Sequence, residues 1–527
     1  MKRNNIIKSI LLTSTIVLGV SCTNLDEEVL DGEVIANTGG GTVNSASLLT
    51  SAYEGLRGFQ GQGQMFALDE MSGDALVGPT RGGDWDDNAT WRQIHVHTWA
   101  PDHNEVKNAW NSLLSQVYTC NLVIENGSGA QVTQARFLRA FYYYNVIDLF
   151  GQVPYREAGK PLTDDPKVWT RTEATEFVIS ELEAIVGSLP ARTAGDASIA
   201  NADAAHFLLA KLYLNKGVFT ASAAAGPYTF AAADMTKVVS HVDAISSSLA
   251  TDYWDNFKPA NNTSPEILFS SKNIQGGAGG NLQFHWRMGM HYNQTPDGWN
   301  GFAIVAEYYN NYNPNDRRIK NADAQIIADF GNPVGMQIGQ MKNGKNRDKT
   351  GKDKDASGVP YTNIPAGTVN LEDRNKNPLI YTSAVTLITS GATLETAGIR
   401  MEKYIPDAAN LGQPNNDFVF MRYSDALMMK AEAIARGGAG TNDIAKLTAL
   451  VSRSGQVGVF PTTLDGIYKE RGKELWLEGW RRNDMIRFGK FLAARELKPY
   501  VSDNRYILFP IPSDALFNPN LSQNPGY

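Results

Sequence analysis

The chain has 527 residues, of which 42% are hydrophobic, 10% aromatic and 20% charged. This length and composition exclude a small disulfide-stabilised scaffold and a disordered chain, and they allow a large hydrophobic core. With 48 Lys and Arg against 55 Asp and Glu, the net charge of −7 argues against nucleic acid as a partner. No run of 18 apolar residues occurs, so we expect no membrane-spanning helix.

The first 21 residues have the features of an export signal. Lys2, Arg3 and Lys8 precede a short, mostly apolar stretch over residues 10–20. The segment Leu18-Gly-Val-Ser-Cys22 then resembles a bacterial lipobox, in which cleavage leaves the cysteine at the N-terminus to receive lipid. The alternative is an ordinary secretory signal followed by an unrelated cysteine.

Cleavage before Cys22 would remove three positive charges and no negative ones, so the mature charge would be −7 − 3 = −10. Residues 22–40 would form an acidic, polar tether, and the lipid would anchor the chain to a membrane surface. With Cys22 acylated, Cys120 is the only remaining thiol, so no intramolecular disulfide is expected.

Helical periodicity predicts a scaffold over residues 41–258 and 415–490. Apolar residues recur at helical spacing in four stretches, 136–150, 172–189, 203–215 and 423–436. Gly151 ends the first of them. Short amphipathic helices with small contact residues indicate stacked hairpins of the tetratricopeptide type, although no 34-residue period is visible.

Residues 259–414 have a different character. They are rich in Gly, Asn and Asp and show few periodic apolar stripes. We expect an irregular insert, which is where function is commonly placed on a rigid scaffold. The predicted fold class is therefore mainly α, with residues 41–527 forming one unit.

The candidate ligand-binding residues fall in two segments rich in tryptophan. They are Asp69, Arg81, Asp84, Trp85, Trp91 and Trp99 in the first segment and Trp299, Asn300 and Phe302 in the second. If residues 91–99 are extended, Trp91 and Trp99 share one face about 26 Å apart. The residues from Asp297 to Gly301 predict a tight turn that presents the indole of Trp299.

Tryptophans in polar, glycine-rich loops suit a carbohydrate site. The C–H face of a pyranose stacks on an aromatic plane, while its hydroxyls need fixed donors and acceptors around the rim. The alternative is that these tryptophans are core residues beneath loops, and for any single tryptophan that alternative is favoured, except that for Trp85 and Trp299, flanked by Gly, Asp and Asn, both interpretations stay equally open. The group as a whole predicts at least one sugar platform.

Three patterns raise the question of a metal. His95 and His97 could bind one if His103 or Asp84 converged on them, but hydrogen-bonded structural histidines are commoner. The segments that begin at Asp353 and at Asp373 start like calcium loops, and both are incomplete; in the first, Ile364 stands where the twelfth-position glutamate belongs. We expect no cofactor, with calcium at these two loops as the alternative.

A charged stretch between Tyr468 and Phe488 reads as one helix. Glu470, Glu474 and Glu478 are spaced four apart, which would allow an acid/base pair. Alternating signs at helical spacing favour instead ion pairs that dock the helix. The chain has no Gly-x-Ser-x-Gly elbow, Walker loop or His-Glu-x-x-His motif, so no catalysis is expected.

Several segments together resemble markers of one family. These are residues 136–154, 210–215, 470–490 and the tail over 510–527. With the lipobox, they are similar to the SusD-like (RagB/SusD) outer-membrane nutrient-binding lipoproteins of Bacteroidetes. The resemblance implies a tetratricopeptide-like scaffold, exposure at the cell surface, pairing with a SusC-like TonB-dependent transporter, and no catalysis. Ligand residues vary in position within the family, so none is transferred.

The resulting functional prediction is a glycan-binding lipoprotein. A mature charge of −10 disfavours polyanionic glycans, which leaves a neutral glucan or fructan, such as a β-glucan. One alternative is a family member that captures peptides. Another is a surface glycoside hydrolase, which would need a converging pair of carboxylates.

Overall fold

Helices outweigh strands in this computed structural model, which describes residues 44–157, 160, 165–276, 279–387 and 394–527. The helices are α2 (Ser45–Glu54), α3 (Gln64–Glu70), α4 (Thr90–Val96), α5 (Asn104–Asn126), α6 (Ala130–Leu149), α7 (Arg171–Ile185), α8 (Ala202–Phe219), α9 (Ala232–Asp243), α10 (Phe284–Arg287), α11 (Ala306–Tyr309), α12 (Ala324–Phe330), α13 (Tyr423–Ala435), α14 (Ile444–Ser452), α15 (Leu464–Glu474) and α16 (Arg481–Arg487). The strands are β1 (Leu76–Val77), β2 (Gly82–Trp85), β3 (Val153–Tyr155), β4 (Lys167–Trp169), β5 (Ile267–Ser271), β6 (Ala303–Ile304), β7 (Lys320–Asn321), β8 (Val334–Gln337), β9 (Gly339–Gln340), β10 (Ile380–Tyr381), β11 (Arg400–Met401) and β12 (Phe418–Arg422). The predicted lipobox with Cys22 and its tether lie outside the described residues.

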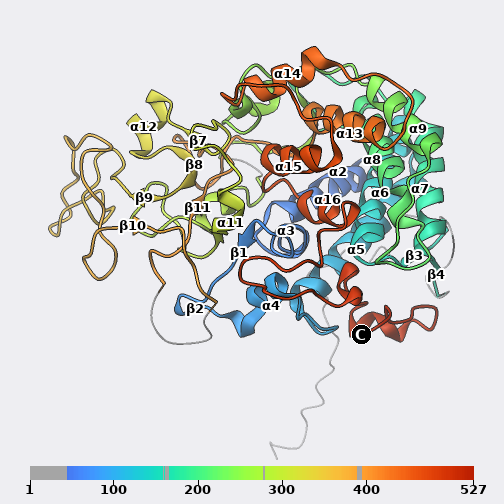
Figure 1. Cartoon of the computed structure of the whole chain (residues 1–527), viewed down its shortest axis with the longest axis horizontal. Helices are drawn as coiled ribbons and strands as arrows, with labels where there is room; N and C mark the ends of the chain where they lie inside the picture. Colours follow the sequence, from blue (N-terminus) through green and yellow to red (C-terminus); the bar gives the residue numbers. More distant parts are fainter. Residues whose placement is uncertain (1–43, 158–159, 161–164, 277–278, 388–393) are drawn as a thin grey trace, which may run out of the picture. The chain divides into compact units, whose positions relative to one another are not determined.

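The scaffold is built from helices that follow one another along the chain. α5 packs against α6, α6 against α7, α7 against α8 and α8 against α9, and they lie side by side at the right of Figure 1. α13 packs against α9, and α15 packs against α13. The C-terminal helices therefore extend the same layer, and the prediction of a mainly α fold with tetratricopeptide-like hairpins is confirmed.

Helix ends fall where side-chain chemistry favours them. The hydroxyl of Thr170 accepts from the backbone N–H of Glu173, whose carboxylate accepts in return, and this capping box starts α7. Asn201 accepts from the N–H of Ala204 at 3.0 Å and starts α8. Gly151, just after α6, has φ +77°, a conformation that favours glycine. All four predicted helices are present, as α6, α7, α8 and α13.

Strand pairing joins the irregular region to the scaffold. β5 and β12 pair antiparallel, and every residue in both strands is buried. Phe269 of β5 and Phe420 of β12 pack against Phe141 of α6, and Phe420 also contacts Phe59. This aromatic group is part of the core that runs between the two regions.

A second pairing brings two distant segments together. β1 pairs antiparallel with β6, with Leu76 opposite Ile304. β2 follows β1 closely along the chain, and β6 directly follows the segment that contains Trp299. The two tryptophan-rich segments predicted to bind ligand are therefore placed beside each other by this short ladder.

The charged stretch over 468–488 is two helices, α15 and α16, so the prediction of one helix is wrong. Leu477 and Gly479 have φ +53° and +78°. Left-handed residues cannot continue a right-handed α-helix, so the chain turns between Glu474 and Arg481.

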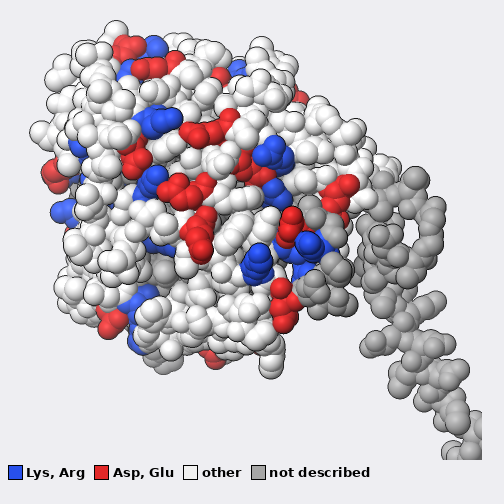
Figure 2. Space-filling view, turned by 90° about the vertical axis from the view of Figure 1, so that its right-hand side faces the viewer, with Lys and Arg blue, Asp and Glu red and all other residues white. Residues whose placement is uncertain are grey.

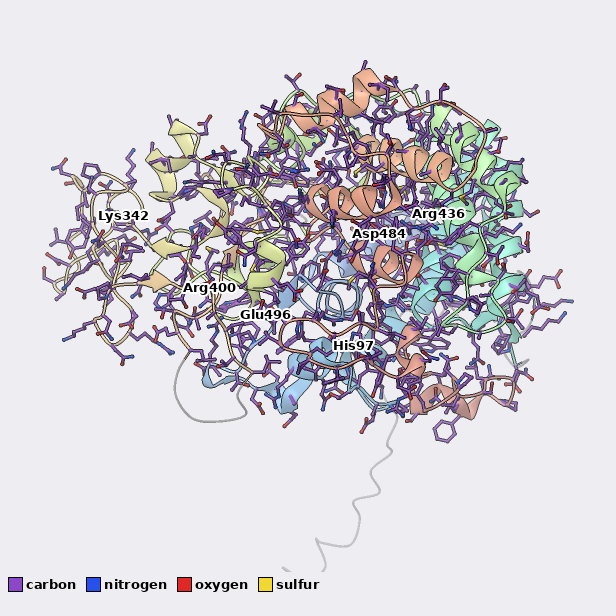
Figure 3. All side chains as sticks on the ribbon, viewed as in Figure 1. His97, Lys342, Arg400, Arg436, Asp484 and Glu496 are labelled. Atoms are coloured by element: carbon purple, nitrogen blue, oxygen red, sulfur yellow. The ribbon has the colours of Figure 1, made fainter. Side chains whose placement is uncertain are left out.

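The charges of this stretch dock α15 and α16 through buried ion pairs, as predicted. Arg422 lies 2.9 Å from Glu474 and 2.6 Å from Glu478. Arg471 of α15 lies 2.8 Å from Asp484 of α16, which is labelled in Figure 3. Since these carboxylates are occupied by arginines inside the protein, they serve packing and not acid/base chemistry.

Charge is mixed over the scaffold face. Figure 2 shows Lys and Arg interspersed with Asp and Glu, with no continuous basic patch on the face in view. A nucleic-acid interface on that face is therefore not supported. In the described part of the chain, no helix combines the length and apolar character needed to cross a bilayer.

Candidate ligand-binding site

Trp85 and Trp299 meet at the end of β2. The indole Nε1–H of Trp85 donates to the carbonyl oxygen of Trp299 at 3.0 Å, and both side chains are partly exposed. A Cβ at Gly301 would lie 2.4 Å from the Trp85 ring, so the ring packs against backbone that only glycine leaves open. The Trp299 ring in turn packs edge-on against Phe284, with centroids 4.8 Å apart.

Trp91 and Phe302 pack against the Trp85 ring. The ring centroids of Trp85 and Trp91 lie 6.3 Å apart, and the Phe302 ring centroid lies 5.0 Å from each of them. Trp91 is 6% exposed and Phe302 is 0% exposed. The prediction that these two rings face a ligand is therefore wrong, because packing beneath Trp85 buries them.

The backbone around Trp85 is unusual. Trp85, Asp87, Asn88 and Ala89 all have positive φ between 43° and 65°, and Asn300 has φ +55°. Residues without a glycine's freedom adopt this region at a cost, and such residues gather at binding and active sites. The strain lies on both segments that form the tryptophan pair.

Arg81 links three segments of the site. Its Nε and Nη2 donate to the carbonyl of Gly301 at 3.0 and 2.8 Å, and its Nη1 donates to the carbonyls of Leu394 and Ala397. Arg81 is buried, and burial lowers its pKa well below the usual value. Arg81 therefore shapes the loops, and the prediction of a direct ligand contact is wrong.

Asn300 is also a structural residue. It is fully buried, and its Oδ1 accepts from Nη2 of Arg400 at 2.8 Å. Arg400 belongs to β11 and is labelled in Figure 3. Since Asn300 is occupied by Arg400 beneath the surface, it cannot bind the ligand as predicted.

A charged rim adjoins Trp85 through its chain neighbour Asp84. Asp84 is exposed and pairs with Arg374 at 3.7 Å, while the Arg374 guanidinium lies 4.8 Å from the Tyr292 ring centroid. Glu395 is buried and contacts His291 at 2.6 Å and Arg374 at 3.3 Å. We call Trp85, Trp299, Tyr292, Asp84 and Arg374 the tryptophan platform.

Trp99 lies in the core, away from the platform. It is 2% exposed, its Nε1 donates to the hydroxyl of Tyr527 at 2.7 Å, and its ring packs 4.5 Å from Phe509. Residues 90–96 form α4, so the extended strand assumed for residues 91–99 is wrong. His97, at the end of α4, is separate from Arg400 in Figure 3.

Asp69 is the other residue removed from the platform. It is 8% exposed on α3 and borders a cavity of about 40 Å³ among Phe59, Phe66 and Phe141. Burial raises its pKa well above the usual value. Asp69 therefore lies apart from the tryptophan platform, in the scaffold interior, and its role as a ligand partner stays a prediction.

The histidines of the possible metal site bond to the protein itself. His95 Nδ1 lies 3.0 Å from the Leu76 carbonyl, and His97 lies 2.8 Å from both the Ser72 carbonyl and the Ser502 hydroxyl. Burial lowers the pKa of both imidazoles, which keeps them neutral. No group of three or more His, Cys, Asp or Glu suited to a metal occurs among the described residues.

The two calcium-loop candidates are tight turns. Asp355 accepts from the N–H groups of Ser357 and Val359 at 2.9 and 3.0 Å. Asp373 accepts from the N–H groups of Asn375 and Asn377, both at 2.8 Å. The third-position carboxylate of the first segment, Asp355, and the first carboxylate of the second, Asp373, are thus engaged by the backbone of their own turns.

Sequence reasoning missed Arg374, Glu395 and Arg400 as parts of the site. Arg374 follows Asp373 in one of these turns, and nothing in its local sequence relates it to Trp85. Only tertiary structure places it against Asp84, so no local signal could have identified it.

Family comparison agrees with this architecture. Residues 242–527 match the model of the SusD family, and residues 29–226 match a model described as starch-binding associating with outer membrane. The first match covers more than half of the chain. The chain belongs to the SusD family. This membership places it among binding proteins and not among enzymes.

Individual SusD relatives are distant. The starch-binding protein SusD of Bacteroides thetaiotaomicron is 26% identical over 491 residues, covering 84% of this chain and 82% of that protein. Surface glycan-binding protein A from Bacteroides fluxus has a TM-score of 0.64 at 19% identity, covering 92% of this chain and 99% of that one. Its counterpart from Bacteroides thetaiotaomicron, solved in complex with laminarihexaose, has a TM-score of 0.62 at 20% identity, covering 91% and 98%. The two structures show that the fold is shared.

Proposed function

We propose that this protein is a cell-surface lipoprotein that binds a neutral glycan on the tryptophan platform and delivers it to a SusC-like TonB-dependent transporter. The observation that carries the proposal is the contact between Trp85 and Trp299. It joins the partly exposed indole of Trp85, on strained backbone, to the backbone carbonyl of Trp299, whose own indole is also partly exposed, and Asp84 and Arg374 form an ion pair next to Trp85.

The chemistry of the platform suits a sugar. Indole faces stack on the apolar face of a pyranose, and the Asp84 carboxylate and Arg374 guanidinium offer an acceptor and donors at the rim. The names of two relatives support a neutral glucan, since one is called starch-binding and another was solved with laminarihexaose. A mature charge of −10 also disfavours polyanions.

The two alternatives have less support. A glycoside hydrolase needs two free carboxylates beside the sugar, but Asp84 is paired with Arg374, and Glu395 is buried against His291. A peptide ligand has less support because the loops of the platform are rich in tryptophan and aspartate, and because the relatives are named for glycans.

Calorimetry with neutral oligosaccharides tests the proposal. Glucan and fructan series of two to six sugars should show affinity that rises with length. The strongest dissociation constant should be micromolar or weaker, which corresponds to a binding free energy no more favourable than about −8 kcal/mol. Equal binding of unrelated peptides, or release of reducing ends during incubation, would contradict a glycan-binding role.

The anchor and the transporter are tested separately. A Cys22→Ser variant should lose its association with the outer membrane, and surface protease should cleave the parent protein in intact cells. The parent protein should co-purify with a TonB-dependent transporter from detergent extracts. Membrane retention of Cys22→Ser would contradict lipidation at that residue.

A further inference from the structure

A separate pocket lies where α11 meets α15, α16 and the segment 490–495. Its volume is about 250 Å³, which suits a single sugar-sized molecule more than a polymer. Glu496, labelled in Figure 3 beside α11, marks its edge, because its N–H donates to Glu307 of α11 at 2.7 Å. We call it the α15 pocket.

The lining of the α15 pocket is positively charged. It contains five cationic side chains, Lys469, Lys473, Arg481, Lys490 and Arg495, and two carboxylates, Asp74 and Glu307. The lining balance is 5 − 2 = +3; Asp465, which pairs with Lys469 at 2.8 Å, and Glu496 at the edge lie outside the lining and reduce it to 5 − 4 = +1, in a chain whose net charge is −7. A local excess of this sign favours an anionic ligand.

The two carboxylates are already engaged. Asp74 forms a two-point ion pair with Arg481, with its oxygens 2.7 and 2.6 Å from Nε and Nη2. Glu307 accepts from the N–H of Glu496. Asp74 is therefore paired with Arg481, and both carboxylates also act on Arg495 through space.

Arg495 keeps a charge that its surroundings compensate poorly. Its Nη1 and Nη2 donate to the carbonyls of Phe491, Ser72 and His95 at 3.2, 2.8 and 3.0 Å. Burial lowers its pKa to about 10 in spite of the nearby Asp74 carboxylate. Lys473 lies 3.8 Å from Glu470, but that carboxylate is held more closely by Arg318 at 2.6 Å.

Three tyrosines form the apolar part of the wall. The hydroxyl of Tyr312 donates to the Lys473 carbonyl at 3.1 Å, and that of Tyr308 donates to the Gly472 carbonyl. Tyr468, partly exposed, is the acceptor for Arg481 Nη2 at 3.0 Å. Because the hydroxyls are occupied, the rings provide surface for the carbon skeleton of a ligand.

We propose that the α15 pocket binds an acidic monosaccharide, a hexuronate, with its carboxylate near Arg495, Lys473 and Lys490 and its ring beside Tyr468. A carboxylate accepts charge-assisted hydrogen bonds from such cations, and a sugar ring matches the size and the aromatic wall of the pocket. This site is separate from the tryptophan platform and does not depend on it.

Titration calorimetry of the unlipidated chain with sodium glucuronate, glucose and sodium sulfate tests the proposal. Glucuronate should bind with a dissociation constant of about 1 mM, and glucose at least tenfold more weakly. Sulfate binding as tightly as glucuronate would contradict the role of the sugar ring, and equal binding of glucose would contradict the role of charge. Absence of glucuronate binding would overturn the proposal.

Variants locate the binding. Lys473→Glu and the exposed Lys490→Glu should each weaken glucuronate at least tenfold, with unchanged circular dichroism and melting temperature. Lys342→Glu makes the same charge change in a different cavity, beside β9, and should bind as the parent does. Trp85→Ala should leave glucuronate binding unchanged, which separates failure of this proposal from failure of the platform. Glucuronate binding that survives both pocket variants would overturn the assignment.

Discussion

The indole N–H of Trp85 donates to the carbonyl of Trp299 at 3.0 Å, across 214 positions of sequence. The contact uses the polar edge of Trp85 for the protein and leaves part of each ring exposed. A platform of this kind is fixed before the ligand arrives, which reduces the entropy lost on binding.

Removing either indole should weaken glycan binding. We expect Trp85→Ala and Trp299→Ala to lose about 2 kcal/mol, or roughly thirtyfold in affinity, since buried aromatic contacts dominate binding energies. Calorimetry with the best neutral oligosaccharide measures the loss, and far-ultraviolet circular dichroism checks the fold. Trp169→Ala is the matched control, because Trp169 is also partly exposed but stacks on Tyr155 in another hairpin. Parent-like affinity in both platform variants would show that the glycan binds elsewhere.

Gly301 should matter as much as the indoles. A Cβ at this residue would meet the Trp85 ring at 2.4 Å, so Gly301→Ala should displace the ring and lower glycan affinity at least tenfold, without removing any aromatic group. Gly187→Ala, where no atom lies within 4 Å of the added Cβ, is the control. If Gly301→Ala binds normally, the position of the Trp85 ring is not critical.

The buried ion pairs of α15 and α16 should be essential for stability. Arg422→Met leaves Glu266, Glu474 and Glu478 without their shared partner, which we expect to cost about 3–5 kcal/mol of unfolding free energy. Lys349→Met breaks an exposed pair with Glu372 and should change stability by about 0.5 kcal/mol or less. Urea unfolding gives both values. Similar losses in the two variants would refute a special role for the buried group.

Glu402 should make stability depend on pH. Burial raises its pKa from 4.5 to about 8, and the Gln337 amide donates to it at 2.6 Å. Because its pKa is higher in the folded state than in the unfolded state, its contribution to stability is complete below about pH 4.5 and is lost as the pH rises to about 8.

The corresponding test uses Glu402→Gln, which stays neutral. Relative to this variant, the parent should lose up to about 1.4 kcal/mol of unfolding free energy per pH unit between about pH 5 and pH 8. Urea unfolding at three pH values measures the difference. The exposed Glu176→Gln controls for a charge change alone. A parent and variant with parallel pH profiles would contradict a protonated Glu402.

The scaffold could be predicted from the sequence because its helices depend on local periodicity and caps. Residues 91–99 show the limit of that approach. Their alternation suggests a strand, yet Trp91, Ile94 and His95 also fit one face of a helix, and that face is the buried one in α4. Packing against β1 and the core decides between the two, and a short segment carries no information about it.

The platform could be predicted only in part. Trp85 and Trp299 are found from their polar, glycine-rich surroundings, but burial of Trp91, Trp99 and Phe302 depends on the β1–β6 pairing and the packing around it. The rim depends on Arg374, which reaches Asp84 from a turn far along the chain.

Affinity electrophoresis of the mature, unlipidated protein tests the central claim most directly. Native gels are cast with single polysaccharides, namely glucans, fructans, mannans and xylans, and the parent protein is compared with Trp85→Ala and Trp299→Ala. We expect one neutral glycan to retard the parent, the two variants to run faster in that gel, and no product to be released on incubation. Unretarded migration of the parent in every gel, or equal retardation of parent and variants, would contradict glycan binding at the tryptophan platform.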